Sequence, residues 1–182
     1  MFSLKKIKFK PIVKSNLKLV LSWRNSKFIR LRMLDQKIIS FKNHLQWFEN
    51  LKKDNKNKSY LIIYDKIRIG VANISKIDNI NKVCTWGFYI AIKKYRYLAL
   101  LIEIKFIDFI FSKFKIRKIW GSTISSNKKI LKIHDILGFK IEGVQRKQIK
   151  VNNCYKDIIL TGLNINEWKK IKKKILKKYD HN

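Results

Sequence analysis

Apolar residues recur with two different periods in the first third of the chain. The segment LKKIKFK at 4–10 partly alternates between apolar and basic residues, which predicts a strand that ends at Pro11, the single proline. The apolar residues of 17–23 instead gather on one side of a helix that Ser15 can cap. Helical spacing returns over 40–53, and the serine that opens this segment predicts a second capped helix.

The centre of the chain favours strands, and the remainder mixes strands with helices. Runs rich in Ile, Val, Tyr and Phe, separated by short polar turns, predict three strands that are adjacent and antiparallel. Gly138 follows an apolar periodic segment and predicts the end of a helix. The expected elements are strands at 60–64, 67–74 and 83–92, a helix at about 98–114, a strand at 117–124, a helix at 127–139, a final hairpin over 140–163 and a basic amphipathic helix over 166–179.

This order of elements indicates a single α/β (α+β) domain. Helices that interrupt a series of strands imply a mixed, mostly antiparallel sheet that is flanked by helices. A length of 182 residues suffices for one core, and the sequence has no internal repeat. We therefore expect the domain proper over 1–163 and a basic C-terminal helix over 164–182 that packs on the same domain.

The charge of the chain is strongly positive but evenly spread. Lys and Arg number 43 against 12 Asp and Glu, which gives a formal charge of +31. The lysines run from Lys5 to Lys178 and accompany an excess of Ile and Asn, so a solvated basic surface explains them better than a specific nucleic-acid site. The charge does attract anionic small molecules such as CoA and nucleotide sugars. We expect a monomer or homodimer without a specific nucleic-acid partner.

Several classes of protein find no support in the sequence. Cys84 and Cys154 are isolated, which predicts reduced thiols, a cytoplasmic location and no metal site. The N-terminus lacks the pattern of a signal peptide, and charged residues interrupt the most apolar stretch, 97–114, so no membrane span is expected. Hydrolase, zinc-peptidase, P-loop and dinucleotide-binding motifs are absent from the sequence.

One constellation of motifs carries a resemblance to a known family. The segment SSNKKILKIHDILGFKIEG at 125–143 and the strand WGFYI at 86–90 resemble the signature of the GNAT superfamily of acetyl-CoA-dependent N-acetyltransferases. Over about 15–163 the chain further resembles the N-acetyltransferases of pseudaminic acid biosynthesis. That narrower likeness rests on LVLSWRN at 19–25, Met33, SFKNHLQWFENLK at 40–52, IGVANISKI at 69–77 and GFYI at 87–90.

The resemblance implies a reaction and its two small-molecule substrates. It implies the GNAT fold, with two central strands that splay apart, and transfer of acetyl from acetyl-CoA without a metal. The acceptor would be the 4-amino group of a UDP-linked sugar, UDP-4-amino-4,6-dideoxy-N-acetyl-β-L-altrosamine, on a route that serves flagellin glycosylation. An enzyme for this reaction must orient the amine, stabilise an oxyanion and protonate the leaving thiolate.

The same resemblance implies two sets of binding residues. For acetyl-CoA they are the backbone of Tyr89, Ile90 and Ala91, together with Arg96, Leu98, Ala99, Asn127 and His134. For the nucleotide sugar they are Arg24, Met33, His44, Trp47, Ser75, Lys76 and Tyr89, where Arg24, His44 and Lys76 suit a diphosphate and the aromatic residues suit a base or sugar ring.

Three of these residues have alternative interpretations. His134 stands where the family often has a tyrosine that protonates the CoA sulfur, and an imidazolium can do this; it can equally be a histidine that only faces the core or solvent. Trp47 has the helical spacing of a core aromatic. Asn127 can cap a helix and bind pantetheine at the same time.

A departure from the family pattern leaves two other functions open. The segment KKYRYLALL at 93–101 has Tyr95, Tyr97 and Ala99 where the family places glycines around the CoA pyrophosphate. Lys93, Lys94 and Arg96 offer positive charge in their place. The first alternative is a protein N-terminal acetyltransferase of the ribosomal-protein type, and the second is a non-catalytic module that binds polyanions.

Overall fold

The computed structural model describes residues 4–33, 35–151 and 153–180, so the outer ends of the predicted ranges 1–163 and 164–182 lie outside the described residues. Its strands are β1 (Ile7–Pro11), β2 (Lys58–Tyr64), β3 (Ile67–Asp78), β4 (Val83–Ile90), β5 (Lys118–Ile124), β6 (Lys140–Val151) and β7 (Cys154–Asn164). Its α-helices are α1 (Leu17–Asn25), α2 (Lys27–Arg30), α3 (Phe41–Lys53), α4 (Ala99–Phe114), α5 (Lys128–Ile136) and α6 (Ile165–Asp180), and 3₁₀ helices span Leu4–Lys6, Lys14–Asn16 and Lys93–Leu98.

The strands form one mixed sheet in the order β1-β2-β3-β4-β5-β7-β6, which confirms the predicted fold class. The pairs β1–β2, β2–β3, β5–β7 and β6–β7 are antiparallel, whereas β4 and β5 are parallel. The parallel register covers only Val83–Thr85 against Lys118–Trp120, although both strands continue. The short register is the splayed centre that the sequence predicts.

The chain divides into two compact units, which we describe separately. The first unit consists of Met1–Ile77 and Gly87–Phe106, and the second of Asp78–Trp86 and Ile107–Asn182. Strand β4 and helix α4 each contribute residues to both units. Among the described residues, no helix is long and apolar enough to cross a bilayer.

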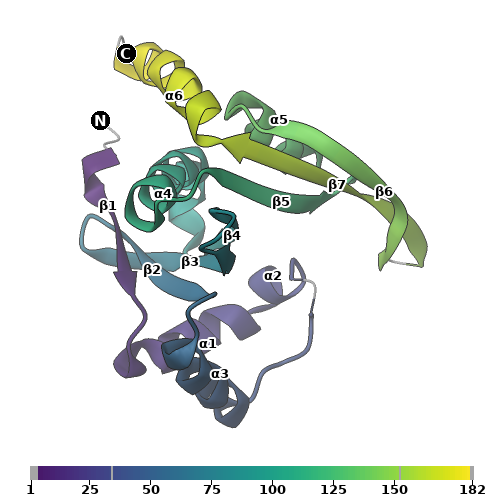
Figure 1. Cartoon of the computed structure of the whole chain (residues 1–182). Helices are drawn as coiled ribbons and strands as arrows, with labels where there is room; N and C mark the ends of the chain where they lie inside the picture. Colours follow the sequence, from purple (N-terminus) through teal and green to yellow (C-terminus); the bar gives the residue numbers. More distant parts are fainter. Residues whose placement is uncertain (1–3, 34, 152, 181–182) are drawn as a thin grey trace. The chain divides into compact units, whose positions relative to one another are not determined.

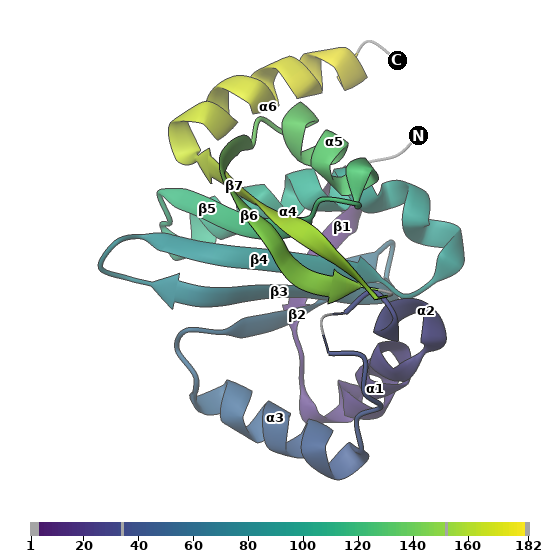
Figure 2. The same ribbon diagram turned by 90° about the vertical axis from the view of Figure 1, so that its right-hand side faces the viewer.

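In the first unit, the helices that follow β1 pack on apolar strand residues. Helix α1 lies beside α2 and α3 (Figures 1 and 2). Full burial of one such aliphatic side chain contributes about 1.5–3 kcal/mol. The cluster consists of buried Ile12, Leu17, Val20, Phe48, Leu61 and Val71, with Trp23, Leu45, Ile63 and Tyr89 packed against it.

In the second unit, β6 and β7 run side by side as a long hairpin, and α6 follows directly from β7 (Figure 1). Helix α6 is fixed through Trp168, which is only 2% exposed and whose Nε1 donates to Asp108 Oδ1 at 2.8 Å. Lys172 Nζ pairs with the other oxygen of Asp108 at 2.6 Å. The amphipathic helix expected at the C-terminus is therefore present, with its apolar side packed inside this unit.

Glycine is required where α5 ends. Gly138 has a φ of +84°, which side chains other than that of glycine rarely adopt. A Cβ built there would also lie 2.8 Å from Ile171 Cγ1 of α6. The helix stop predicted at this glycine is confirmed, although α5 itself ends at Ile136.

Local hydrogen bonds explain where element boundaries differ from the sequence prediction. The expected cap at Ser15 is wrong: Asn16 precedes α1, and its Oδ1 accepts the Val13 N–H at 3.1 Å, which places Ser15 inside a tight 3₁₀ turn. Strand β1 ends at Pro11 as predicted, and an edge strand permits a proline there, but the strand begins only at Ile7 because Leu4–Lys6 form a 3₁₀ helix. By contrast, Ser40 caps α3 as predicted and accepts the Asn43 N–H.

Candidate functional site

Tyr89 and Arg24 lie close together in the first unit. Tyr89, near the end of β4, is half-buried against the apolar cluster of that unit. Burial raises the pKa of its phenol well above the ordinary value, and the positive charge of Arg24 opposes part of that rise. The phenol therefore stays protonated at neutral pH and can donate a hydrogen bond beside a guanidinium.

Arg24 and Arg30 hold two consecutive carbonyl groups of the segment between α2 and α3. Arg24 Nη2 donates to the Asp35 carbonyl at 2.6 Å, and Arg30 Nη1 donates to the Gln36 carbonyl at 2.7 Å. Within the described residues, Arg24 Nη1 and Arg30 Nε are buried and have no hydrogen-bond partner. A buried N–H without an acceptor costs about 1–3 kcal/mol, so an acceptor from a ligand or water would stabilise both side chains.

The ring of Phe28, in α2, contacts two further guanidinium groups. The Cζ atom of Arg96 lies 3.2 Å from the ring centroid, and that of Arg32 lies 3.8 Å from it. Arg32 is also fixed by its Nη1, which donates to the Phe28 carbonyl at 2.7 Å.

The four arginines, which we call the arginine cluster (Arg24, Arg30, Arg32 and Arg96), have no acidic counterpart. In the part of the chain that the structure describes, none of them forms an ion pair with a carboxylate. Arg32 and Arg96 carry like charges beside the same Phe28 ring, so they repel each other. An anionic ligand would relieve that repulsion.

His44 and Trp47 form a stacked pair on α3. Their ring centroids are 4.9 Å apart and their planes differ by 18°. Burial lowers the pKa of His44, and a hydrogen bond to the backbone of Leu17 opposes part of the shift. Among the described residues, His44 Nε2 is buried without a partner. Trp47 is 37% exposed, so the alternative interpretation of Trp47 as a core residue does not hold.

The other residues that the sequence predicts to bind the acceptor substrate lie after α2 and near the end of β3, in the first unit. Met33 follows α2, and its N–H donates to the Arg30 carbonyl at 3.1 Å. Ser75 and Lys76 lie near the end of β3, where Lys76 has a φ of +53°. The structure thus brings Arg24 to Tyr89 and stacks His44 on Trp47, while Met33 shares its turn with the arginine cluster.

Some of the backbone groups that the sequence predicts to contact acetyl-CoA form hydrogen bonds within the first unit instead. The N–H groups of Ala91 and Ile92 both donate to the Ile69 carbonyl of β3. A Cβ at Gly70 of β3 would collide with the Tyr89 carbonyl oxygen.

The glycine-free segment after β4 forms a 3₁₀ helix, Lys93–Leu98, that leads into α4. Tyr95 packs inward, with its ring centroid 5.8 Å from that of Tyr64, whereas Tyr97 is 57% exposed. Leu98 is fully buried and Ala99 opens α4, so only the backbone of these two predicted cofactor residues is open to a role in binding. Arg96 Nε is buried and, within the described residues, unpartnered.

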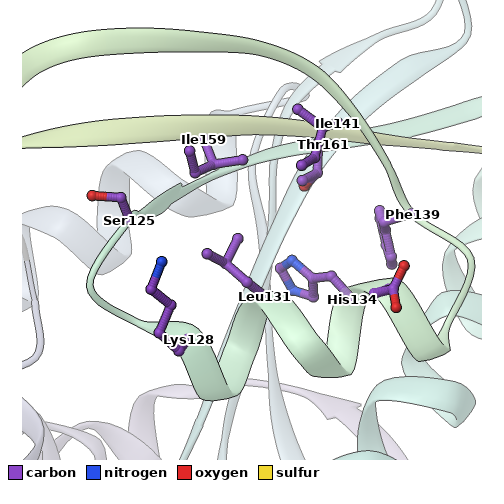
Figure 3. A pocket seen from close by; sticks show the side chains of 9 residues that line it. Ser125, Lys128, Leu131, His134, Phe139, Ile141, Ile159 and Thr161 are labelled. Carbon is purple, nitrogen blue, oxygen red and sulfur yellow. The ribbon is translucent and has the colours of Figure 1, made fainter.

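In the second unit, α5 presents His134 to a cavity. Asn127 caps this helix, since its Oδ1 accepts the Ile130 N–H at 3.5 Å. His134 is 7% exposed, and its ring lies 5.4 Å from that of Trp86 and 5.0 Å from that of Phe139. Figure 3 shows His134 and Leu131 rising from α5 toward the strands above them.

The cavity beside α5, which we call the α5 cavity, holds about 310 Å³. Thr161 on β7 contributes to its wall, and the Thr161 Oγ1 is buried without a partner among the described residues. Sequence reasoning did not name Thr161 or Trp86 as site residues, although Trp86 opens the motif WGFYI. Its wall consists of Ser125, Lys128, Leu131, His134, Asp135, Phe139, Ile141, Ile159 and Thr161 (Figure 3).

The described residues contain no group of three or more His, Cys, Asp or Glu side chains that could hold a metal ion. Burial raises the pKa of the Cys84 thiol to about 12, so it is not a nucleophile at neutral pH.

Comparison with known proteins identifies the fold. No family model matches the sequence. Among solved structures, the chain is similar to the spermidine N-acetyltransferase of Vibrio cholerae in complex with CoA and spermine, with a TM-score of 0.81 and 16% identity over 90% of this chain and 98% of that chain. A chimera of the Vibrio cholerae enzyme and hSSAT gives a TM-score of 0.79, with 17% identity over the same shares of the two chains.

A dodecameric structure of the Vibrio cholerae enzyme in an intermediate state is also similar, with a TM-score of 0.77 and 15% identity over 90% of this chain and 96% of that chain. The likeness confirms that this chain has the GNAT fold of these N-acetyltransferases. At such identities it defines the fold, and the acceptor has to be inferred from the residues of this chain.

Proposed function

We propose that the chain is an acetyl-CoA-dependent N-acetyltransferase whose acceptor is the amine of an anionic, nucleotide-linked amino sugar. The fold supports the class of reaction, and the resemblance of the motifs at 19–25, 40–52 and 69–77 supports UDP-4-amino-4,6-dideoxy-N-acetyl-β-L-altrosamine as the acceptor. The reaction would then belong to pseudaminic acid biosynthesis in the cytoplasm.

The arginine cluster is the observation that carries the choice of acceptor. Spermidine and spermine, named with the similar Vibrio cholerae enzyme, are polycations that require carboxylates for binding. The first unit of this chain instead presents four guanidinium groups without an acidic counterpart, one of them beside Tyr89. Charge-assisted hydrogen bonds from Arg to phosphate are strong and geometrically specific, so an acceptor that carries a diphosphate suits this unit.

Arg24 and Tyr89 would donate hydrogen bonds to two different parts of the acceptor substrate. Arg24 Nη1 has no partner within the described residues and is available to a phosphate oxygen. The phenol of Tyr89 is protonated and donates to a hydroxyl or carbonyl oxygen of the sugar. The exposed ring of Trp47, stacked on His44, offers a flat surface for a base or sugar ring.

Acetyl transfer needs one proton to leave the amine and one to reach the sulfur. The neutral amine attacks the thioester carbonyl, the new C–N bond replaces the C–S bond, and the amine loses a proton while the thiolate gains one. We assign the second proton to His134, which borders the α5 cavity. The Thr161 hydroxyl offers a further donor at the wall of the same cavity.

The chain fits acetyl-CoA without a glycine-rich turn. The backbone of Tyr89, Ile90 and Ala91 would contact the amide groups of pantetheine, and Arg96 with Lys93 and Lys94 would supply charge for the phosphates of CoA. The side chains of the 3₁₀ helix do not all crowd its surface, since Tyr95 packs on Tyr64. A non-catalytic polyanion-binding module is the second candidate function, because the glycines are missing and the charge is high.

The test is acetyl transfer to a panel of acceptors, followed by mass spectrometry of the products. The panel contains the UDP-linked 4-amino sugar, spermidine and a peptide with the N-terminus of a ribosomal protein. We expect only the nucleotide sugar to gain about 42 Da, because acetylation replaces one amine hydrogen by an acetyl group. Acetylation of the peptide alone would replace the proposed acceptor, and salt-sensitive RNA binding without any CoA binding would favour the non-catalytic module.

Arg24→Ala separates the two substrates in the same assay. Loss of a charged hydrogen bond to phosphate typically costs a factor of about ten or more, so the KM for the nucleotide sugar should rise by about that factor. The KM for acetyl-CoA should change less than about twofold. Arg68→Ala, which removes an exposed arginine of β3, is the matched control. An equal rise in both KM values would contradict the assignment of Arg24 to the acceptor.

A further inference from the structure

Asn25, the last residue of α1, contacts the segment that leads into α3 through both ends of its side-chain amide. Its Nδ2 donates to the Ile39 carbonyl at 2.8 Å, and its Oδ1 accepts the Ile39 N–H at 2.9 Å. The carboxamide therefore satisfies both backbone groups of one residue, as a neighbouring strand would do. The proposed function gives this side chain no role.

The contact between Asn25 and Ile39 closes a loop. The two residues are 14 positions apart in the sequence, and Ile39 immediately precedes Ser40, which caps α3. The end of α1 is thereby tied to the start of α3. The connection between them includes α2 and runs as an arch before it reaches α3 (Figure 1).

Hydrogen bonds, rather than apolar burial, hold the second half of this connection. Residues 35–38 are all exposed, and Ile38 exposes 74% of its surface. A segment with so few buried side chains has low local stability unless polar contacts fix its backbone. Arg24, Asn25 and Arg30 supply such contacts, since each donates to a carbonyl group within 35–39.

The orientation of Arg24 depends on the same segment. Its Nη2 donates to the Asp35 carbonyl at 2.6 Å. Its Nη1, which is buried without a hydrogen-bond partner within the described residues, is the donor that the proposed function assigns to a phosphate oxygen. Because the guanidinium is planar and rigid, the position of the Asp35 carbonyl also fixes the direction of Nη1.

We propose that Asn25 is a positioning residue, which fixes the segment 35–39 and through it orients Arg24 toward the diphosphate of the acceptor. This inference rests on the proposed function and adds to it a residue that contacts neither substrate. A residue that only stabilises the loop would alter the free energy of unfolding. A positioning residue also alters the affinity for the anion, and it does so only while Arg24 is present.

The test is isothermal titration calorimetry of the full chain with UDP, which compares the parent chain, Asn25→Ala, Arg24→Ala and the double variant. We expect each single variant to weaken UDP binding by about tenfold. Because Asn25 acts through Arg24, the double variant should bind UDP no more weakly than Arg24→Ala does. Two independent residues would instead multiply their effects, to about a hundredfold.

Two further variants control for size and for stability. Asn25→Leu keeps nearly the size of the side chain but can neither donate nor accept, and it should reproduce the effect of Asn25→Ala on UDP binding. Asn50→Ala removes an exposed amide of α3 that accepts from Gln46 Nε2, and it should change the affinity for UDP less than twofold. Thermal unfolding establishes that each variant is folded.

Hydrogen–deuterium exchange measures the hold of Asn25 on the segment directly. In Asn25→Ala and Asn25→Leu, the amides of 35–39 should exchange at least about tenfold faster than in the parent chain, because the Ile39 N–H loses its acceptor and the segment loses two hydrogen bonds. Exchange in β2 and β3 should stay as it is in the parent chain, and Asn50→Ala should leave 35–39 unchanged.

Three results would overturn the proposal: no measurable UDP binding to the parent chain at millimolar concentration, effects of Asn25→Ala and Arg24→Ala that multiply, or unchanged exchange of 35–39. Coupled effects on UDP binding in a chain that acetylates no acceptor would disprove the proposed function alone. Conversely, acetylation of the nucleotide sugar with an unchanged KM in Asn25→Ala would disprove the positioning role alone.

Discussion

The arginine cluster of the first unit and the α5 cavity of the second unit differ in charge and in their exposure to water. The cluster concentrates positive charge and donors that the described residues do not satisfy, such as Arg24 Nη1 and Arg30 Nε. The wall of the cavity combines apolar side chains with polar ones, of which His134 and Thr161 are buried. The first arrangement suits an anion, and the second holds two polar side chains away from water.

This difference indicates a division of labour between binding and chemistry. Charge on a partly exposed surface selects and attracts a ligand but is screened by salt. A proton donor enclosed by apolar groups acts on charge that develops in its immediate surroundings, where the dielectric constant is low. Changes in the cluster should therefore alter KM for anionic substrates, and changes around the cavity should alter kcat.

The largest expected effect comes from Gly70→Ala, which attacks the backbone that positions Tyr89. A Cβ at this position would collide with the Tyr89 carbonyl, a backbone atom that cannot move without breaking the pairing of β3 with β4. We expect destabilisation of more than about 4 kcal/mol, or failure to fold, as measured by urea unfolding. Gly87→Ala is the matched control, because a Cβ there meets nothing within 4 Å. Equal stability of the two variants would disprove this packing.

The next largest effect is expected for His134→Phe. This change keeps an aromatic ring beside Trp86 and Phe139 but removes the proton donor. Loss of a general acid should lower kcat by about a hundredfold, with both KM values changed less than about threefold. His134→Tyr restores an acidic proton and should recover at least about tenfold of the loss. Unaltered kcat in His134→Phe would show that this histidine only packs.

A smaller effect is expected for Gly121→Ala, which would disturb the α5 cavity indirectly, through Trp86 and Phe139. The new Cβ would lie 2.9 Å from Trp86 Cζ3, and Trp86 in turn stacks on Phe139 with ring centroids 4.6 Å apart. Overpacking of this kind costs about 1–3 kcal/mol, and we expect kcat to fall several-fold while the KM for the nucleotide sugar is kept. Gly143→Ala, whose Cβ would meet Leu160 at an ordinary 3.7 Å, is the control.

If Gly121→Ala instead raised the KM for the nucleotide sugar and left kcat unchanged, the proposed separation of substrate binding in the first unit from proton transfer in the second unit would be wrong. Steady-state kinetics of both glycine variants, with unfolding curves measured in parallel, distinguish the two outcomes.

The smallest effect concerns pH and His44. Because burial lowers the pKa of His44 below its ordinary value of 6.5, the unfolded chain binds a proton that the folded chain does not take up. Stability is therefore complete above pH 6.5 and is lost as the pH falls through 6.5 toward the folded pKa, by at most about 1.4 kcal/mol per pH unit for one proton. The free-energy difference between the parent chain and His44→Asn should shrink over this range. A constant difference from pH 7.5 to pH 5.5 would contradict this.

The fold was predictable where the sequence pattern is local. Ser40 and Asn127 cap helices through their own side chains, and Gly138 ends α5, so short-range chemistry decided those positions. The start of α1 was not predictable, because two hydrogen bonds between Val13 and Asn16 close the turn before it: the Val13 N–H donates to Asn16 Oδ1, and the Asn16 N–H donates to the Val13 carbonyl. The segment 93–98 lacked glycines, and its 3₁₀ conformation followed only from its packing.

The candidate site was predictable where a motif marks a residue and not where tertiary contacts create the feature. Arg24, Tyr89, His44 and His134 stand in motifs that resemble a known family. Phe28 has no such mark, since its role depends on two arginines that approach it from separate segments. The same holds for Thr161, which lies in a strand without a motif and contributes to the wall of the α5 cavity only through the packing of α5 on β7.

The most direct test of the central claim is a competition experiment. The chain is mixed with limiting acetyl-CoA and equal concentrations of the UDP-linked 4-amino sugar and spermidine, and both products are quantified by mass spectrometry. The unneutralised arginine cluster predicts that acetyl is transferred almost entirely to the nucleotide sugar and that added salt reduces this preference. Preferential acetylation of spermidine, or no acetylation of the sugar, would contradict the account.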